Sequence, residues 1–362
     1  MSKYSSTHLL IEAEAGMGDF SNEAAVPQAT STSELPPKDL REYIMTQVQG
    51  SRVRFPDFQT FLAHWPQGVH PDIDRLEQDV HGILKSIFPN TEDVGRLQRT
   101  KAAKLGLFAA SWWAYSSYEA LRTLLTLCIW LFVWDDETDS GQFSYMINSF
   151  SQAAEFRQET LSYLKESLSD GGEPGCSTIS TNPIITGFGP VGRSIASWGD
   201  RDQVEMFLDE LVFFIQMVEV EQRALATPHL PTVDDYMKQR MGTSAVRVFL
   251  AIMDDLGNDW PSERHIVLEK RDKRKQAQSQ VDTLIPLLFL ELGSIQAAID
   301  HGAEMVKASI GRFEAAEENL LARYSDRPNS GRALKDYIDG CKYACTANLN
   351  WRQVHVPRIR FR

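Results

Sequence analysis

The spacing of apolar residues predicts helices along most of the chain. Between residues 72 and 88, Leu76, Val80, Ile83 and Leu84 recur at steps of three and four, which places them on one face of a helix. The alternation of apolar and polar residues that marks a half-buried strand is not found in the sequence. We therefore expect an all-α protein of roughly ten helices. The expected helices span residues 72–88, 101–113, 118–136, 143–168, 189–198, 203–225, 233–256, 295–324 and 333–351, and residues 284–292 form an apolar stretch around Pro286.

Composition along the chain divides it into three parts. Residues 1–50 are rich in Ser, Thr, Pro and Ala, which predicts a weakly ordered N-terminal arm. Residues 51–351 are expected to form one helical domain, in which 56–71 is a loop packed on the body and 169–183 is a loop of turn-forming residues. Residues 352–362 form a basic tail.

The stretch at residues 124–140, LLTLCIWLFVWDDETDS, changes abruptly from apolar to acidic. In a helix, Asp135 and Asp139 lie one turn apart on the same face, with Asp136 beside them. Clustered carboxylates at the rim of an apolar wall suit Mg²⁺, which binds one or two carboxylates together with substrate phosphate oxygens. The alternative is a buried helix whose charged end simply meets solvent.

Aromatic residues gather on both sides of this stretch. A cavity lined with ring faces would stabilise a carbocation and keep water away from it. The alternative, and the commoner fate of aromatic residues, is an ordinary core. The candidate lining residues are Phe108, Trp112, Trp113, Phe132, Phe213, Phe214 and Trp351.

A second polar group follows about a hundred residues later in the segment YMKQRMGTS. Tyr236, Arg240 and Ser244 are spaced at four residues and so share one helix face. The planar fork of Arg240 is suited to two oxygens of a diphosphate. The alternative is a basic face exposed to solvent.

Charge and cysteine content narrow the classes of function. The 362-residue chain has a net charge of −12, which argues against a nucleic-acid surface and implies that a bound diphosphate needs a metal. Its four cysteines show neither zinc-type pairs nor dense disulfide spacing. We find no signal-peptide pattern, and the apolar run at 124–134 is too short to span a bilayer. We expect a soluble, cytoplasmic protein that is a monomer or homodimer.

Four segments together resemble the class I terpene synthases, and specifically fungal sesquiterpene cyclases of the kind that includes presilphiperfolanol synthases. The resemblance covers roughly residues 50 to 351. The segments are SWWAYSSYEALR (111–122), WLFVWDDETD (130–139), LPTVDDYMKQRMGTS (230–244) and TANLNW (346–351).

The resemblance implies a class I α-helical fold around an apolar cavity. It also implies that farnesyl diphosphate is ionised with three Mg²⁺ ions, or Mn²⁺ in their place, and that the resulting cation cyclises to a hydrocarbon or alcohol. Asp135 matches the principal metal ligand, supported by Asp136 and Asp139. Arg240 matches the diphosphate sensor, whereas Thr243 matches the linker position and Ser244 the effector position at a helix break.

Two family motifs are not found. The second metal motif, N-D-x-x-S-x-x-x-E, begins correctly at Asn258, but Pro261 interrupts the helix and Ile266 stands where the glutamate belongs. The terminal Arg-Tyr pair is also missing from the basic tail. The alternative to an active cyclase is therefore an impaired or non-catalytic paralogue, or a splice form, that binds an apolar ligand beside an incomplete metal site.

Overall fold

Every described element is helical, which confirms the predicted fold class. The structure is a computed structural model that describes residues 37–48, 51–89, 94–139, 144, 146–169, 179–227, 229–254, 283–325 and 328–355. The α-helices are α1 (Pro37–Val48), α2 (Phe58–Phe61), α3 (Ile73–Ile87), α4 (Val94–Ala102), α5 (Leu105–Trp112), α6 (Tyr118–Asp139), α7 (Phe150–Ser167), α8 (Pro183–Thr186), α9 (Gly189–Trp198), α10 (Arg201–Leu225), α11 (Val233–Thr243), α12 (Val246–Asp254), α14 (Leu284–Leu292), α15 (Ile295–Arg323) and α16 (Pro328–His355). A short 3-10 helix, η3 (Met146–Asn148), precedes α7.

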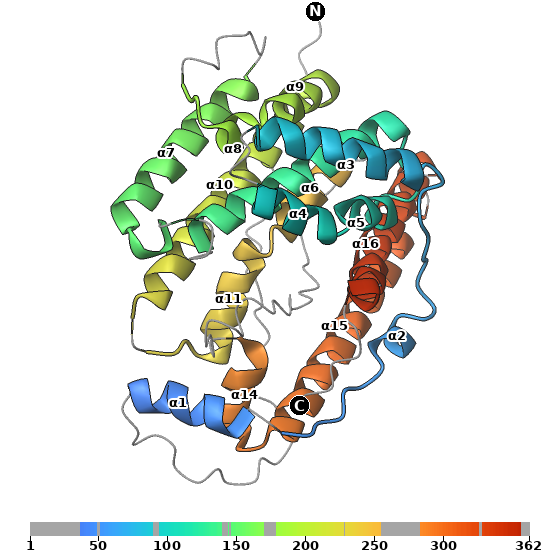
Figure 1. Cartoon of the computed structure of the whole chain (residues 1–362). Helices are drawn as coiled ribbons and strands as arrows, with labels where there is room; N and C mark the ends of the chain where they lie inside the picture. The colour runs from blue at the N-terminus through green and yellow to red at the C-terminus, as the bar shows by residue number, and fades with distance from the viewer. Residues whose placement is uncertain are drawn as a thin grey trace, which may run out of the picture.

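Helix α6 lies at the centre of the main core. It packs against α3, α5, α9 and α10 (Figure 1). Four successive residues that surround the helix axis, Leu127, Cys128, Ile129 and Trp130, are all fully buried. A helix that is apolar all round has to be enclosed by other helices, and this enclosure fixes where its acidic C-terminal end emerges.

Polar caps fix where the neighbouring helices begin. Asp200 accepts a hydrogen bond from the backbone N–H of Gln203 at 2.9 Å, and the Gln203 side chain accepts one from the Asp200 backbone at 2.8 Å. This reciprocal capping box starts α10. Thr232 accepts a hydrogen bond from the backbone N–H of Asp235 at 3.1 Å, so it caps α11.

Three predicted helices are interrupted in the structure. The helix expected at 101–113 is divided at Lys104, whose φ is 51°. The helix expected at 233–256 is divided between α11 and α12 by Ala245, whose φ is 55°. In the helix expected at 143–168, η3 and α7 are separate elements. Neither left-handed residue is a glycine, so local sequence gave no warning of these breaks.

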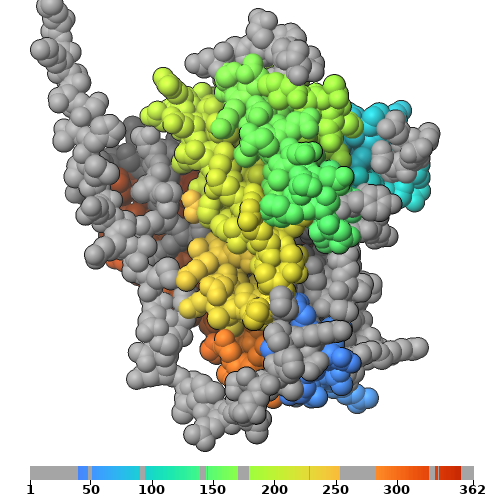
Figure 2. Space-filling view, turned by 90° about the vertical axis from the view of Figure 1, so that its left-hand side faces the viewer, coloured from blue at the N-terminus to red at the C-terminus, as the bar shows by residue number. Residues whose placement is uncertain are grey.

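A second, smaller cluster contains a helix that the sequence analysis did not predict. Helix α1 lies inside the segment assigned to the N-terminal arm and packs on α14. Its Ile44 is fully buried with Leu288 and Phe289 of α14 and Ala298 of α15. Figure 2 shows α1 in blue beside the orange α14 at the lower end of the molecule. The helical body therefore begins before residue 51.

The segment between α1 and α3 crosses α15 and α16, as expected for a loop packed on the body. The Trp65 indole donates to Glu314 of α15 at 2.9 Å. Thr346 of α16 donates to the carbonyl of Pro66 at 2.8 Å. One turn of this segment is helical as α2, which was not predicted.

Among the described helices, none taken singly is both long and apolar enough to cross a membrane. Only α14 and α15 taken together meet that test, and they bend by 118° where they join. The bend follows Gly293, whose φ is 68°.

Ile44 provides a test of the unpredicted helix. Ile44→Ala would leave a cavity in the small cluster, and we expect it to lower the free energy of unfolding by roughly 2–4 kcal/mol. Hydrogen exchange of residues 37–48 should become faster than in the wild-type protein. Glu42→Ala, at an exposed position of the same helix, is the control and should leave this exchange unchanged. Equal exchange in both variants would show that Ile44 does not hold α1 in place.

Candidate active site

The acidic sequence forms the last turns of α6. Asp135 lies on the wall of a pocket, and Asp136 beside it is half-buried. Of Asp139 only the backbone is described. Because four residues are close to one helical turn, Asp139 starts from the same face as Asp135. The structure therefore keeps the predicted arrangement as far as it describes it.

Glu137, in the middle of the acidic run, serves a different purpose. It is buried and forms an ion pair with Arg96 of α4. Burial raises the pKa of Glu137, and the charge of Arg96 and its hydrogen bond act in the opposite direction. Two residues along a helix turn the side chain well away from Asp135, so this carboxylate fastens the end of α6 to α4.

The pocket lies between α5, α6, α10, α11, α12 and α16. Its empty space is about 530 Å³, including the part that opens to solvent. The wall is mostly apolar, with Asp135 and Arg240 as its two charged members. The lining residues are Phe108, Trp112, Leu131, Phe132, Asp135, Phe214, Arg240, Thr243, Ser244, Ala245, Val246, Phe249 and Asn348.

Ring contacts hold the aromatic wall together. Phe249 of α12 lies with its ring centroid 5.3 Å from that of Trp112 and 5.5 Å from that of Trp113. Phe108 contacts Trp112 at 5.1 Å in a tilted arrangement and Trp351 at 5.1 Å edge to face. Such arrangements stabilise aromatic clusters beyond their buried area, so the wall has a fixed shape.

The predicted aromatic lining residues fall into two groups. Phe108, Trp112, Phe132 and Phe214 line the pocket. Trp113, Phe213 and Trp351 are not among its lining residues. Trp113 is core behind Phe249, Phe213 lies beneath the guanidinium of Arg247 at 4.9 Å, and Trp351 donates to the carbonyl of Ala103 at 2.8 Å. For these three, packing explains the residue type.

Arg240 reaches the pocket from the last turn of α11. Only 9% of the residue is exposed, so the alternative of a solvated basic face does not hold for it. Its Nη1 donates to the hydroxyl of Thr243 at 3.1 Å. Ser244 ends α11, and after the turn at Ala245 the chain starts α12 at the pocket wall. The three residues predicted in this segment therefore line one pocket together.

The junction between α11 and α12 has the electrostatics of an anion site. The first N–H groups of α12 carry the partial positive charge of a helix N-terminus. The guanidinium of Arg240 adds a full positive charge beside them. Asp135 supplies negative charge on the same pocket, which suits a cation placed between it and a bound anion.

Several lining residues were not singled out from the sequence. Leu131 lies one turn before Asp135, so helical spacing could have placed it on the same face. Asn348 lies in the quoted segment TANLNW, of which only the tryptophan was selected. Ala245, Val246 and Phe249 enter the pocket because the chain turns at Ala245. The apolar spacing does not mark that turn, although the family resemblance implied a helix break at Ser244.

The described residues fit a metal bound jointly with a phosphate. No group of three or more His, Cys, Asp or Glu side chains within the described ranges could hold a metal alone. Asp135 and Asp136 offer hard oxygen donors, and Mg²⁺ is commonly bound by one or two carboxylates plus substrate phosphates. The segment 255–282, where the second metal motif was sought, lies outside the described residues.

A model of a known protein family matches the part of the chain that contains the site. Residues 126–266 match the family model described as terpene synthase family 2, C-terminal metal binding. The part of the chain that contains the site is therefore similar to the metal-binding domain of terpene synthases. The matched segment contains both Asp135 and Arg240, and its description as metal-binding agrees with the prediction that the site takes a metal.

Two curated relatives match this chain over most of their length. The sesquiterpene cyclase hepA of Aspergillus oryzae is 26% identical over 324 residues, which cover 82% of this chain and 86% of that protein. The 4-epi-cubebol synthase of Streptosporangium roseum, described as cyclising (2E,6E)-farnesyl diphosphate, is 24% identical over 82% of this chain and 94% of its own. The likeness to presilphiperfolanol synthases in particular stays a prediction.

Solved structures share the helical fold of this chain. A hedycaryol synthase in complex with nerolidol has a TM-score of 0.59 at 16% identity, covering 83% of this chain and 98% of that one. A protein from ancestral sequence reconstruction has a TM-score of 0.63 at 16% identity, covering 86% and 92%. At this identity the likeness shows the shared helical fold.

Gly242 tests whether the packing of α11 sets the position of Arg240. A Cβ at this position would overlap Met217 of α10 and approach Phe213 to 3.2 Å. We expect Gly242→Ala to push α11 away from α10, to destabilise the protein by roughly 1–3 kcal/mol and to weaken diphosphate binding. Thermal unfolding and calorimetry measure the two effects.

Gly311→Ala is the matched control, because a Cβ there meets no atom within 4 Å in α15. It should stabilise the protein by about 0.5–1 kcal/mol through helix propensity and leave diphosphate binding unchanged. If the two alanine variants behave alike, the close approach at Gly242 has no role in the site.

Proposed function

We propose that this protein is a terpene synthase that ionises farnesyl diphosphate and cyclises the resulting carbocation to a sesquiterpene hydrocarbon or alcohol. One observation carries the proposal. Asp135 and Arg240 line a single pocket whose remaining wall is mostly aromatic and aliphatic. A substrate with an anionic end and a long apolar chain matches that division.

The polar end of the pocket would hold the diphosphate. Arg240 can donate two hydrogen bonds to its oxygens, and the N-terminus of α12 favours negative charge beside it. Asp135 and Asp136, with Asp139 by the family pattern, would hold Mg²⁺ or Mn²⁺. When bound, the metal neutralises charge on the departing diphosphate. Thr243 orients the Arg240 guanidinium through their hydrogen bond.

The apolar end would hold the hydrocarbon chain. The rings of Phe108, Trp112 and Phe249 offer negative quadrupole faces to a cation. Their contacts with one another keep the wall in a fixed shape, and the apolar wall excludes water that would quench the cation early. The conformation of the bound hydrocarbon chain then decides the product, together with the step that ends the reaction, which is loss of a proton or capture of water.

The relatives support the choice of substrate. One is named a sesquiterpene cyclase, and another is described as cyclising farnesyl diphosphate. Three bound ions, a cytoplasmic location and a monomeric or homodimeric state complete the proposal on the family pattern.

The second candidate is a protein that binds an apolar ligand without turning it over. The missing second metal motif favours it, because that motif supplies further metal ligands in the family. The family match ends at residue 266, in the segment where the sequence departs from the motif.

Incubation of the purified protein with farnesyl diphosphate and Mg²⁺, followed by gas chromatography of the volatiles, separates the two candidates. We expect cyclised products above the no-enzyme blank. A folded protein that binds a farnesyl analogue but releases no product would support the non-catalytic candidate instead.

Asp135→Asn tests the metal role. The amide keeps the shape of the carboxylate but removes its charge, so we expect turnover to fall by about a hundredfold or more. Asp336→Asn, at an exposed position of α16, is the control and should turn over normally. An Asp135→Asn variant with wild-type turnover would refute the assignment.

A further inference from the structure

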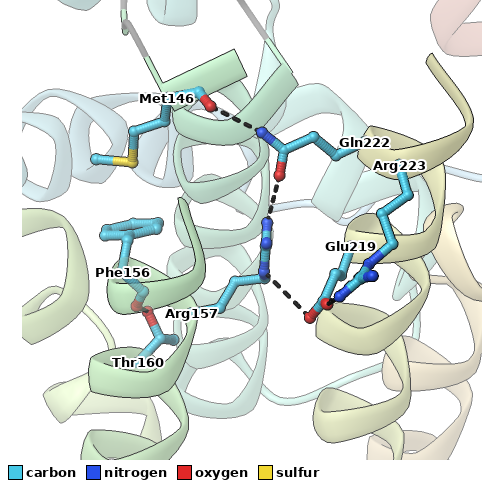
Figure 3. Close-up of polar contacts among 7 residues, drawn as sticks. All are labelled: Met146, Phe156, Arg157, Thr160, Glu219, Gln222 and Arg223. Atoms are coloured by element: carbon cyan, nitrogen blue, oxygen red, sulfur yellow. Dashed lines mark hydrogen bonds and ion pairs between the residues drawn. The ribbon is translucent and has the colours of Figure 1, made fainter. Parts of the chain in front are cut away.

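A buried polar network lies behind the acidic end of α6 and is not part of the pocket wall. Its centre is Arg157 of α7, which is only 3% exposed. The Nη1 of Arg157 donates to the side-chain carbonyl of Gln222 on α10 at 2.8 Å, as Figure 3 shows. Both side chains come from helices that also pack on α6 or on the turn after it.

Gln222 links Arg157 to the backbone of η3. Its Nε2 donates to the carbonyl of Met146 at 2.7 Å and lies 3.5 Å from that of Ile147. Both carbonyls belong to η3, which begins seven residues after the end of α6 at Asp139 and packs on α6. Gln222 is itself buried, so its amide is held in one orientation by a donor on one side and an acceptor on the other.

The network has a counter-ion that offsets the buried charge. Glu219, one turn before Gln222, lies with its Oε2 3.6 Å from the Nε of Arg157 and also pairs with Arg223 at 2.6 Å. Burial lowers the pKa of Arg157, and Glu219 opposes that shift. Burying a guanidinium costs desolvation free energy, so an apolar residue would serve better if packing alone were needed here.

The same part of α7 also contacts α6 just before its acidic residues. Trp134, the neighbour of Asp135, stacks on Phe156 with 5.6 Å between ring centroids and donates to the hydroxyl of Thr160 at 3.0 Å. Phe156 is the residue next to Arg157. Helix α7 therefore contacts α6 directly at Trp134, just before the carboxylates. It also holds η3 indirectly, because Arg157 binds Gln222 and Gln222 binds Met146.

We propose that Arg157 and Gln222 are positioning residues for the metal-binding carboxylates at the end of α6. They act by holding η3, so that the acidic turn keeps the geometry a metal requires. The inference rests on the proposed function, because it assigns the metal to Asp135 and its neighbours. Outer partners of this kind affect metal affinity although they do not touch the ion.

Gln222→Glu is the sharpest test. The carboxylate is nearly isosteric and keeps an acceptor for Arg157, but it replaces the donor to Met146 with an oxygen. A merely structural role would be preserved or strengthened by the added charge pair with Arg157. A positioning role would be lost, because the carbonyls of η3 would face a carboxylate.

Binding of Mn²⁺ in the presence of inorganic diphosphate, followed by electron paramagnetic resonance, gives a readout independent of turnover. Specific binding is the part that disappears in Asp135→Asn. In Gln222→Glu we expect half-saturation of that part at about tenfold higher Mn²⁺. The Mg²⁺ concentration for half-maximal turnover should rise similarly. Lys342→Gln, which breaks an ion pair with Glu317 between α16 and α15, is the control and should leave both values unchanged.

Three results would count against the proposals in different ways. Wild-type affinity for Mn²⁺ in folded Gln222→Glu would overturn the positioning role. If that variant does not fold, Arg157→Lys replaces it, since lysine keeps the charge near Glu219 without the fork that reaches Gln222, and wild-type affinity there would overturn the role equally. Absence of specific Mn²⁺ binding in the unsubstituted protein would overturn the proposed function itself.

Discussion

The structure depends on the burial of the second half of α6, which is apolar on every side from Leu127 to Trp134. Such a stretch can lie only where other helices enclose it, and the charged residues that follow it must then appear where the enclosure ends. Glu137 is paired inward with Arg96, and Asp135 faces the pocket. One physical constraint thereby places a carboxylate at the edge of an aromatic cavity.

The opposite wall of the pocket is set by a break in the chain. If α11 and α12 formed one continuous helix, Arg240 and Phe249 would lie at different heights along the same straight axis. The turn at Ala245 instead brings the end of one helix and the start of the next to the same wall. Gly242 allows α11 to lie close to α10, so the position of Arg240 follows from the packing of these helices.

Sequence periodicity was sufficient for the long helices because each buries a regular apolar face. It did not predict α1, because that helix is mostly polar and only a few of its residues, such as Ile44, pack on α14. It also missed the breaks at Lys104 and Ala245, since left-handed residues other than glycine carry no local signature. For the site, the charged residues were recognisable from their spacing, but Trp113 and Phe213 were not separable from the pocket wall. The presence of aromatic residues alone does not show which side of a helix faces a cavity.

In the proposed site, one diphosphate is held by Asp135 through a metal and by Arg240 through direct hydrogen bonds. Calorimetric titration of the protein with inorganic diphosphate, with and without Mg²⁺, measures this joint binding. We expect binding that requires Mg²⁺ and is lost in both Asp135→Asn and Arg240→Lys. Binding of equal strength without Mg²⁺, or binding that survives in either variant, would contradict it.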